Sequence, residues 1–205
     1  MYKPILLKVY HKGKICQDSW YFSLFFAYSI PNSFFQEITM TTNNSSLTFL
    51  ENALYQMPDA YARLEGAPDY QNIYGIVRFY SVENGVIVNA EVYGLPSASD
   101  PCAPFIHGFH IHEGNSCTGN TTAPFSNAGA HYNPHSCQHP AHAGDMPPLF
   151  ANKGFAWMLY YTDRFSIPEI IEKTVIIHEN PDDFHTQPSG NSGSMIACGV
   201  IQSVE

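Results

Sequence analysis

Histidines are gathered in one part of this chain, and their spacing is typical of metal binding. The chain has 10 histidines, and nine of them lie between residues 107 and 185. Imidazole nitrogens and carboxylate oxygens are the groups that bind zinc and copper in proteins. Seven side chains form the candidate ligand set, namely His110, His112, His131, His139, His142, Asp145 and His178. Seven ligands are too many for one tetrahedral site, so the set predicts two sites that share a ligand.

The local sequence around these residues predicts how they come together. His110 and His112 are two residues apart, and alternate side chains of a β-strand point to the same face. The ligands between 131 and 145 lie in a stretch rich in Gly, Pro, Asn and Ala, which we interpret as a loop folded around an ion. His178 directly follows the β-branched run 174–177, a pattern that predicts a ligand at the end of a strand.

Several segments of the chain resemble the copper/zinc superoxide dismutases, and they occur in that family's order. The matching segments are His-Gly-Phe-His-Ile-His-Glu-Gly (107–114), Ala-Gly-Ala-His-Tyr-Asn-Pro (128–134), His-Ala-Gly-Asp (142–145), Lys-Thr-Val-Ile-Ile-His (173–178) with Asp182 and Asp183, and Gly-Asn-Ser-Gly-Ser-Met-Ile-Ala-Cys-Gly-Val-Ile (190–201). The resemblance covers roughly residues 58–201. The short spacing from His139 to His142 is similar to that of bacterial-type members.

This resemblance implies a role for each candidate ligand. It assigns copper to His110, His112, His131 and His178, and it assigns zinc to His131, His139, His142 and Asp145. His131 would bridge the two metals and act catalytically as a local proton donor while superoxide is converted to dioxygen and peroxide. Asp182 would accept hydrogen bonds from His110 and His139 and so orient both rings. His107 is matched as a structural residue, whereas we interpret His11, His135 and His185 as ordinary surface or core residues.

The five cysteines are Cys16, Cys102, Cys117, Cys137 and Cys198, an odd number that leaves one unpaired within the chain. The resemblance implies a disulfide between Cys117 and Cys198. Cys102 and Cys137 could form a second bridge or remain free thiols. Because Cys137 is two residues before His139, contact with zinc is a further alternative.

One position departs from the family pattern. Met195 stands one residue after Ser194, where the family places an arginine that guides the anion to copper. The segment 184–193 also contains no Lys or Arg. Because steering into a charged cleft changes association rates by ~10–10³, we expect slow dismutation with a weak salt dependence. The alternative hypothesis is a non-catalytic protein of the same fold that buffers copper and zinc.

The hydrophobic pattern predicts an all-β domain. The predicted strands are 61–65, 73–81, 86–93, 105–112, 155–161, 174–178 and 196–201, and the Ser-x-x-Glu pattern at 166–169 predicts a short helix over 167–172. Glu83-Asn84-Gly85 predicts a hairpin turn. The resemblance implies an eight-stranded antiparallel Greek-key β-barrel or sandwich whose long loops bind the metals.

Charge narrows the class of partner. The formal net charge is −9, and the sequence from residue 40 onward contains 16 acidic and only 5 basic residues. This balance argues against nucleic acid and anionic membranes. Superoxide is the expected substrate, while the resemblance leaves homodimerisation and a copper-delivery partner open.

The amino-terminal part lies outside the resemblance. We expect residues 1–57 to be an extension and 58–205 to be the dismutase-like domain. The apolar run 20–30 after four lysines resembles a signal peptide poorly, since Asp18 interrupts it and no good cleavage site follows. Met40 is an alternative start, and residues 49–55 could form one helical turn. We therefore expect a cytoplasmic protein, with export through 1–39 as the alternative.

Overall fold

The computed structural model describes residues 10–11, 14–15, 56–97, 102 and 105–205. Contacts along the chain divide it into two units, Met1–Thr42 and Asn43–Glu205. In the first unit, β1 (Tyr10–His11) pairs antiparallel with β2 (Lys14–Ile15). The signal-like run 20–30, Met40 and the helical turn at 49–55 lie outside the described residues. The domain boundary at 57/58 stays a prediction.

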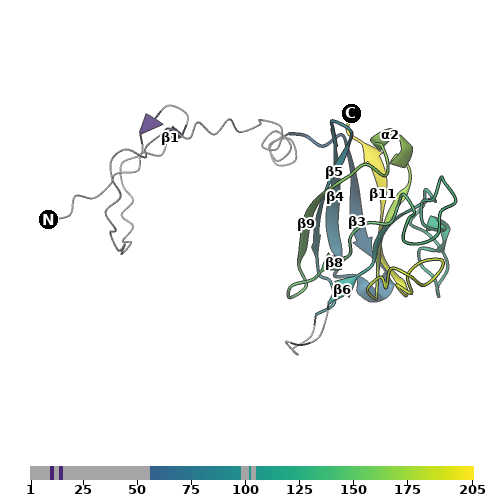
Figure 1. Cartoon of the computed structure of the whole chain (residues 1–205). Helices are drawn as coiled ribbons and strands as arrows, with labels where there is room; N and C mark the ends of the chain where they lie inside the picture. The colour runs from purple at the N-terminus through teal and green to yellow at the C-terminus, as the bar shows by residue number, and fades with distance from the viewer. Residues whose placement is uncertain (1–9, 12–13, 16–55, 98–101, 103–104) are drawn as a thin grey trace, which may run out of the picture. The chain divides into compact units, whose positions relative to one another are not determined.

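The second unit is built on one curled antiparallel sheet (Figure 1). Its strands, in the order in which they pair, are β7 (Phe109–His112), β10 (Thr174–His178), β11 (Met195–Ser203), β3 (Ala60–Gly66), β4 (Tyr74–Val82), β5 (Gly85–Tyr93) and β9 (Ala156–Thr162). A separate short ladder joins β6 (Ile106–His107) to β8 (Leu149–Phe150), and the short helices are η1 (Pro68–Tyr70), η2 (Ser126–Ala128) and α2 (Ile167–Ile170). The predicted all-β antiparallel class is confirmed.

The core lies on one face of this sheet because apolar residues alternate along its strands. In β5, Val86, Val88, Ala90 and Val92 are each at most 2% exposed and belong to the main apolar cluster. Alternate positions of a strand share a face, so this period places the four side chains on one side. The same cluster takes residues from the other strands of the sheet and from α2. The sheet therefore forms a rigid support for the strands that carry histidines.

Two local predictions can be compared with the structure. Asn84 has φ of 64° in the turn between β4 and β5, as the Asn-Gly signal predicted. Glu169 accepts hydrogen bonds from the main chain and hydroxyl of Ser166, which makes the capping box. The helix ends at Ile170 rather than at residue 172, because Glu172 adopts φ of 66° and its N–H bonds to β11.

The predicted strand 105–112 is interrupted at Gly108. Its first half, β6, pairs with β8, whereas its second half, β7, pairs with β10. At the break, Gly108 donates to the carbonyl of Asn180 at 2.8 Å and accepts from the N–H of His178 at 2.8 Å. If β6 and β7 are counted as one interrupted strand, the described domain has eight strands.

Two long connections cover one side of the domain. The segment between β7 and β8 is drawn in teal to green, and the segment between β10 and β11 is drawn in yellow, and they lie together beside the sheet (Figure 1). Hydrogen bonds between His139 and Gln187 join the two segments directly. Among the described residues, the helices are all too short or too polar to cross a lipid bilayer.

Candidate metal centre

The histidine pair on β7 faces away from the core. Phe109 and Ile111 are fully buried in the main apolar cluster, so the alternation of the strand directs His110 and His112 to the opposite face. That face is not open to solvent, because His110 is 0% and His112 is 2% exposed beneath the covering loops. The strand thus presents two neighbouring imidazoles to a closed space between sheet and loops.

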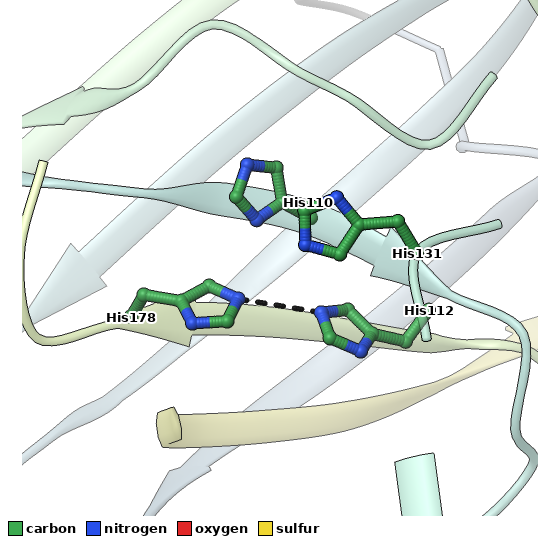
Figure 2. Close-up of side chains that lie close together, drawn as sticks. All are labelled: His110, His112, His131 and His178. Atoms are coloured by element: carbon green, nitrogen blue, oxygen red, sulfur yellow. Dashed lines mark hydrogen bonds between the residues drawn. The ribbon is translucent and has the colours of Figure 1, made fainter. Parts of the chain in front are cut away.

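A third histidine reaches the same space from the neighbouring strand. β10 runs antiparallel to β7, with Ile176 opposite His110 and Thr174 opposite His112. The pairing of β10 with β11 shifts at His178, which lies opposite Met195. Together with His131 from the loop, the three strand histidines offer nitrogen atoms that all lie within 4.8 Å of one another (Figure 2).

The hydrogen bonds of His112 and His178 leave two nitrogen lone pairs facing each other. Each ring donates its Nδ1–H to a main-chain carbonyl, His112 to Gly129 at 2.8 Å and His178 to Gly193 at 3.2 Å. Burial lowers the pKa of His112 well below its usual range and that of His178 to about 3, so both rings are neutral at neutral pH. Their Nε2 atoms are 3.3 Å apart and neither carries a proton, an arrangement that a bound cation would stabilise.

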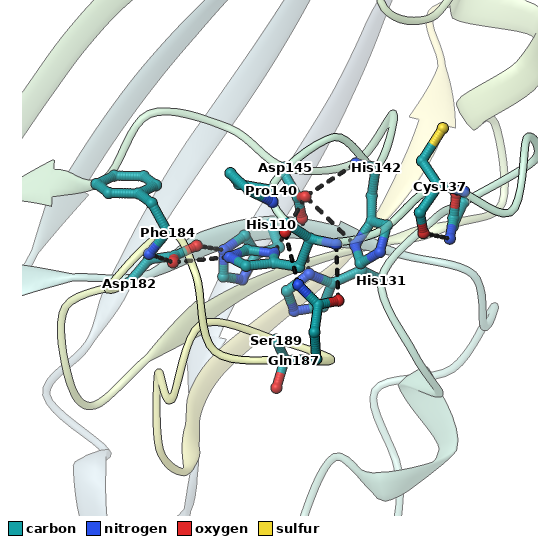
Figure 3. A network of polar contacts seen from close by, with 12 residues as sticks. His110, His131, Cys137, Pro140, His142, Asp145, Asp182, Phe184, Gln187 and Ser189 are labelled. Atoms are coloured by element: carbon teal, nitrogen blue, oxygen red, sulfur yellow. Dashed lines mark hydrogen bonds and ion pairs between the residues drawn. The ribbon is translucent and has the colours of Figure 1, made fainter.

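The second group is centred on a carboxylate. Three Nδ1 atoms approach Asp145: that of His131 at 2.7 Å, that of His139 at 3.1 Å and that of His142 at 3.3 Å. Figure 3 shows His131 and His142 beside Asp145. Burial acts to raise the pKa of Asp145, but the hydrogen bond from His131 and the electrostatic influence of the neighbouring rings outweigh it and lower the pKa. Three imidazoles and one carboxylate form a donor set that suits tetrahedral zinc.

Four of the nitrogens that would face the metals have no hydrogen bond. Buried nitrogens without such a partner include His110 Nδ1, His131 Nε2, His139 Nδ1 and His142 Nδ1. Buried polar atoms normally have partners, so four unsatisfied ring nitrogens in one place need an explanation. Two cations between these atoms would satisfy all four. The residues present therefore fit the pair of metals that the resemblance implies.

Asp182 connects the two groups. Its Oδ2 accepts from His110 Nε2 at 2.8 Å, and its Oδ1 accepts from His139 Nε2 at 2.9 Å. These bonds, with a third from the Phe184 N–H, outweigh burial and hold the pKa of Asp182 well below its usual range. An ionised acceptor at this place fixes the tautomer of both rings and leaves each Nδ1 as a lone pair.

Several contacts around the centre could not be expected from residue types. The carbonyls of Gly129 and Gly193 orient two rings, Gln187 bonds to the main chain of His139, and Arg164 bonds to carbonyls near Asp145. Every residue has a carbonyl group, and a loop gives no periodic signal that places it. Gly190 also lies against Asp182 and His139, where any β-carbon would collide with both.

Three of the remaining histidines, His107, His135 and His185, belong to neither group. His107 is buried, and its Nδ1 donates to the carbonyl of His178 at 2.9 Å, which agrees with a structural role. His135 is exposed, as is His185, whose side chain is 79% exposed. Nothing is described of the His11 side chain.

One disulfide joins a covering loop to the sheet. Cys117 forms a disulfide with Cys198 of β11, which confirms the implied pairing. Cys137 is exposed and forms no disulfide with another described residue, and it belongs to neither metal group within the described part of the chain. The second bridge that the sequence left open is therefore not formed.

Met195 contributes an apolar side chain beside His178. It is partly buried and packs against an apolar cluster that includes Ile176 and Cys198. A thioether in such a contact carries no charge and offers no strong hydrogen bond to an anion. The loop that follows His178 adds negative charge at Glu179 and Asp183.

Comparison with known proteins places the chain in a family. The profile of the copper/zinc superoxide dismutases (SODC) matches residues 73–201, which is more than half of the chain. Superoxide dismutase [Cu-Zn] of Deinococcus radiodurans is 30% identical over 148 residues, covering 63% of this chain and 78% of that protein.

Two further relatives come from distant organisms. Superoxide dismutase [Cu-Zn] 2 of Aquifex aeolicus is 30% identical over 145 residues, covering 63% of this chain and 80% of that protein. Superoxide dismutase [Cu-Zn] A of Xenopus laevis is 31% identical over 161 residues, covering 71% of this chain and 97% of that protein. The family binds copper and zinc, and this chain has two groups able to hold metal ions. The chain belongs to the copper/zinc superoxide dismutases, a family of oxidoreductases.

Proposed function

We propose that this protein converts superoxide to dioxygen and hydrogen peroxide with copper and zinc bound in the two groups. The observation that carries the proposal is His131, the one side chain that belongs to both groups. Its Nδ1 contacts Asp145, while its buried Nε2 has no hydrogen-bond partner. One imidazole placed between two donor sets is what a pair of bridged metal ions requires.

The chemistry of the donors supports one metal for each group. Copper(II) favours several imidazole nitrogens, and the group His110, His112, His131 and His178 offers four. Zinc favours tetrahedral sites of nitrogen and oxygen, and the group His131, His139, His142 and Asp145 offers three imidazoles and a carboxylate. When bound, copper would supply one-electron redox chemistry and zinc would remain in one oxidation state.

The protein's own part in the reaction is to hold rings and to supply a proton. Formation of peroxide from superoxide consumes two protons. His131 can carry one at Nε2 when that atom is not a ligand, because the contact of its Nδ1 with Asp145 keeps the ring in place. Asp182 holds one ring of each group, so neither donor set rotates while the proton moves.

Met195 sets the expected rate. Because Met195 supplies no cation opposite His178, the anion lacks a charged guide at this position. Charge steering is worth ~10–10³ in association rate, so we propose dismutation that is slow for this family and only weakly dependent on salt.

The second candidate is a protein that buffers copper and zinc with little catalysis. Met195 and the acidic surface favour it, because neither attracts superoxide. The complete ligand groups and the Asp182 link favour the enzyme, because storage does not require a shared ligand. The two candidates differ in turnover at full copper occupancy.

The test is superoxide consumption by pulse radiolysis of the full chain, with bound copper and zinc quantified and ionic strength varied. Catalytic consumption at about one copper and one zinc per chain supports the enzyme, and a nearly flat salt response supports the role given to Met195. Protein loaded with zinc alone is the control. Absence of turnover at full copper occupancy would establish the buffering protein instead.

Homodimerisation and loading by a copper-delivery protein belong to the same proposal, and the family resemblance is what supports them. Light scattering of the metal-loaded full chain measures the first. Transfer of copper from a loaded delivery protein to the metal-free chain measures the second.

A further inference from the structure

The main chain of His139 is held by a side chain from the other loop. Gln187 Oε1 accepts the His139 N–H at 2.9 Å, and Gln187 Nε2 donates to the His139 carbonyl at 2.7 Å. The amide thus makes paired bonds with a single residue, in the manner of a neighbouring strand. A further contact of Nε2 with the carbonyl of His185 at 3.4 Å anchors the amide within its own loop.

A second side chain holds the rest of the same turn. Arg164, which follows β9, directs Nη1 to the carbonyls of Pro140 at 3.1 Å, His142 at 3.3 Å and Asp145 at 3.5 Å. The guanidinium is a permanently charged donor, and carbonyls that converge on one nitrogen gain from its charge. One side chain thereby sets the distance between the two ends of the turn that carries His142 and Asp145.

The first part of this turn, residues 139–143, has little other support. Its main-chain bonds are local, such as Ala141 to Gln138. Only the end of the turn is tied to the sheet: Gly144 donates to Tyr132 and accepts from the N–H of Ile111 on β7, and Asp145 forms a β-bridge with His110. Strand neighbours, which fix the rings on β7 and β10, are lacking for the described residues 139–143. The positions of His139 and His142 therefore depend on side chains that reach the turn from elsewhere.

We propose that Gln187 and Arg164 are positioning residues of the zinc group. They hold the ligand-bearing turn 139–145 by its main chain from two sides, and they act on the metal only through that turn. The inference rests on the assignment of zinc to this group. Because both residues are themselves exposed, their truncation leaves no buried cavity, and we expect the variants to keep the fold.

Two substitutions test the proposal in the full chain. Gln187→Glu keeps the shape and the acceptor but places an oxygen, in place of Nε2, against the carbonyl of His139. Arg164→Met keeps the length and removes every donor, whereas Arg164→Lys returns one charged donor. Gln202→Glu and Arg63→Met make the same chemical changes at exposed positions of β11 and β3 and serve as matched controls.

The measurements are zinc affinity, by competition with a chromophoric chelator, and the visible spectrum of Co(II) bound in place of zinc. We expect each variant to bind zinc roughly tenfold more weakly, within the 10–100-fold range found for residues that support metal ligands. The Co(II) bands should change shape or intensity, Arg164→Lys should recover part of the affinity, and the controls should match the wild type.

Two results would overturn the inference in different ways. Wild-type zinc affinity with an unchanged Co(II) spectrum in both variants would show that the two side chains do not position the ligands. A wild-type Co(II) spectrum that survives Asp145→Ala would show that zinc binds elsewhere, which removes the zinc assignment itself.

Discussion

The two ligand groups are built in different ways although they share His131. In one group, His110, His112 and His178 stand on paired strands, and two of these rings are oriented by main-chain carbonyls. In the other, the ligands lie on a turn between β7 and β8, and side chains from distant segments hold that turn. A sheet places ligands by its register, whereas a loop needs additional contacts to do so.

This contrast explains why the two groups differ in the polar contacts that orient their ligands. In the strand group, β7 and β10 already determine the positions of the rings. The group therefore needs only the Gly129 and Gly193 carbonyls and one carboxylate oxygen of Asp182, Oδ2, to orient them. In the turn group, the other carboxylate oxygen of Asp182, Oδ1, orients His139, while Gln187 and Arg164 hold the main chain of the turn. Asp182 and His131 are the two residues through which the groups depend on each other.

Replacement of His131 should weaken metal binding in both groups at once. Residues that only orient a ligand typically change metal affinity by up to ~100-fold. We expect His131→Ala to lower the affinity for both metals by more than this, since a direct ligand is lost from each group. Metal content after dialysis, measured for copper and zinc separately, checks this. His142→Ala is the control and should affect mainly zinc. Loss of only one metal from His131→Ala would contradict the shared role.

Asp182→Asn should weaken both groups by a smaller amount. An amide can accept from one ring but presents N–H groups to the other, so one of the two rings loses its acceptor. We expect metal affinity to fall ~10–100-fold, measured by competition titration. Asp183→Asn is the matched control, because its contacts are with His185 and Thr186 rather than with a ligand ring. Equal behaviour of the two variants would break the proposed link.

Acid should destabilise the metal-free protein through the strand group. The pKa of His178 falls from 6.5 to about 3 on folding and that of His112 falls in the same direction, both chiefly through burial. Between these values the unfolded chain binds more protons, so stability is lost as pH falls below about 6.5. We expect roughly 2 kcal/mol from His178 alone by pH 5.

Urea unfolding of the metal-free chain at pH 7 and pH 5 measures this loss. The lowered pKa of Asp182 acts in the same direction at lower pH, below its usual value of 3.8. His178→Gln should reduce the difference between the two pH values, while His185→Gln should leave it unchanged. An equal loss in the wild type and His178→Gln would assign the pH dependence to other residues.

Met195→Arg should change the strand group without affecting the turn group. A cation beside His178 supplies the missing guide, so we expect dismutation to rise by about tenfold and to become sensitive to ionic strength. Pulse radiolysis at several salt concentrations measures both effects, with zinc affinity expected to stay constant. Met195→Gln is the uncharged control, and equal rates for the two variants would remove Met195 from the account of the rate.

Sequence reasoning succeeded where a period or a motif carries information. The alternation of β5, the Asn84-Gly85 turn and the Ser166 capping box follow directly from local residue chemistry. The seven candidate ligands stand out in the sequence because six of them are histidines in one part of the chain, and the structure brings all seven into two groups able to hold a metal ion. The antiparallel fold and the Cys117–Cys198 disulfide followed from resemblance and are confirmed.

The features that sequence could not give depend on tertiary contacts. The break at Gly108 arises because Asn180 and His178 bond to its main chain. These partners lie about 70 residues away, so the sequence of residues 105–112 does not predict the break. Gln187 is an ordinary loop glutamine until the loop folds over His139. The same holds for Arg164, whose partners are carbonyls of residues distant in sequence.

The central claim is that one imidazole, that of His131, joins two metal sites. The most direct test is electron paramagnetic resonance of the full chain loaded with Cu(II) and Co(II), compared with the chain loaded with Cu(II) and Zn(II). A shared imidazole couples the two unpaired-electron systems, so the account predicts that the Cu(II) signal is strongly reduced when Co(II) replaces zinc. An undiminished Cu(II) signal with both metals bound would contradict it.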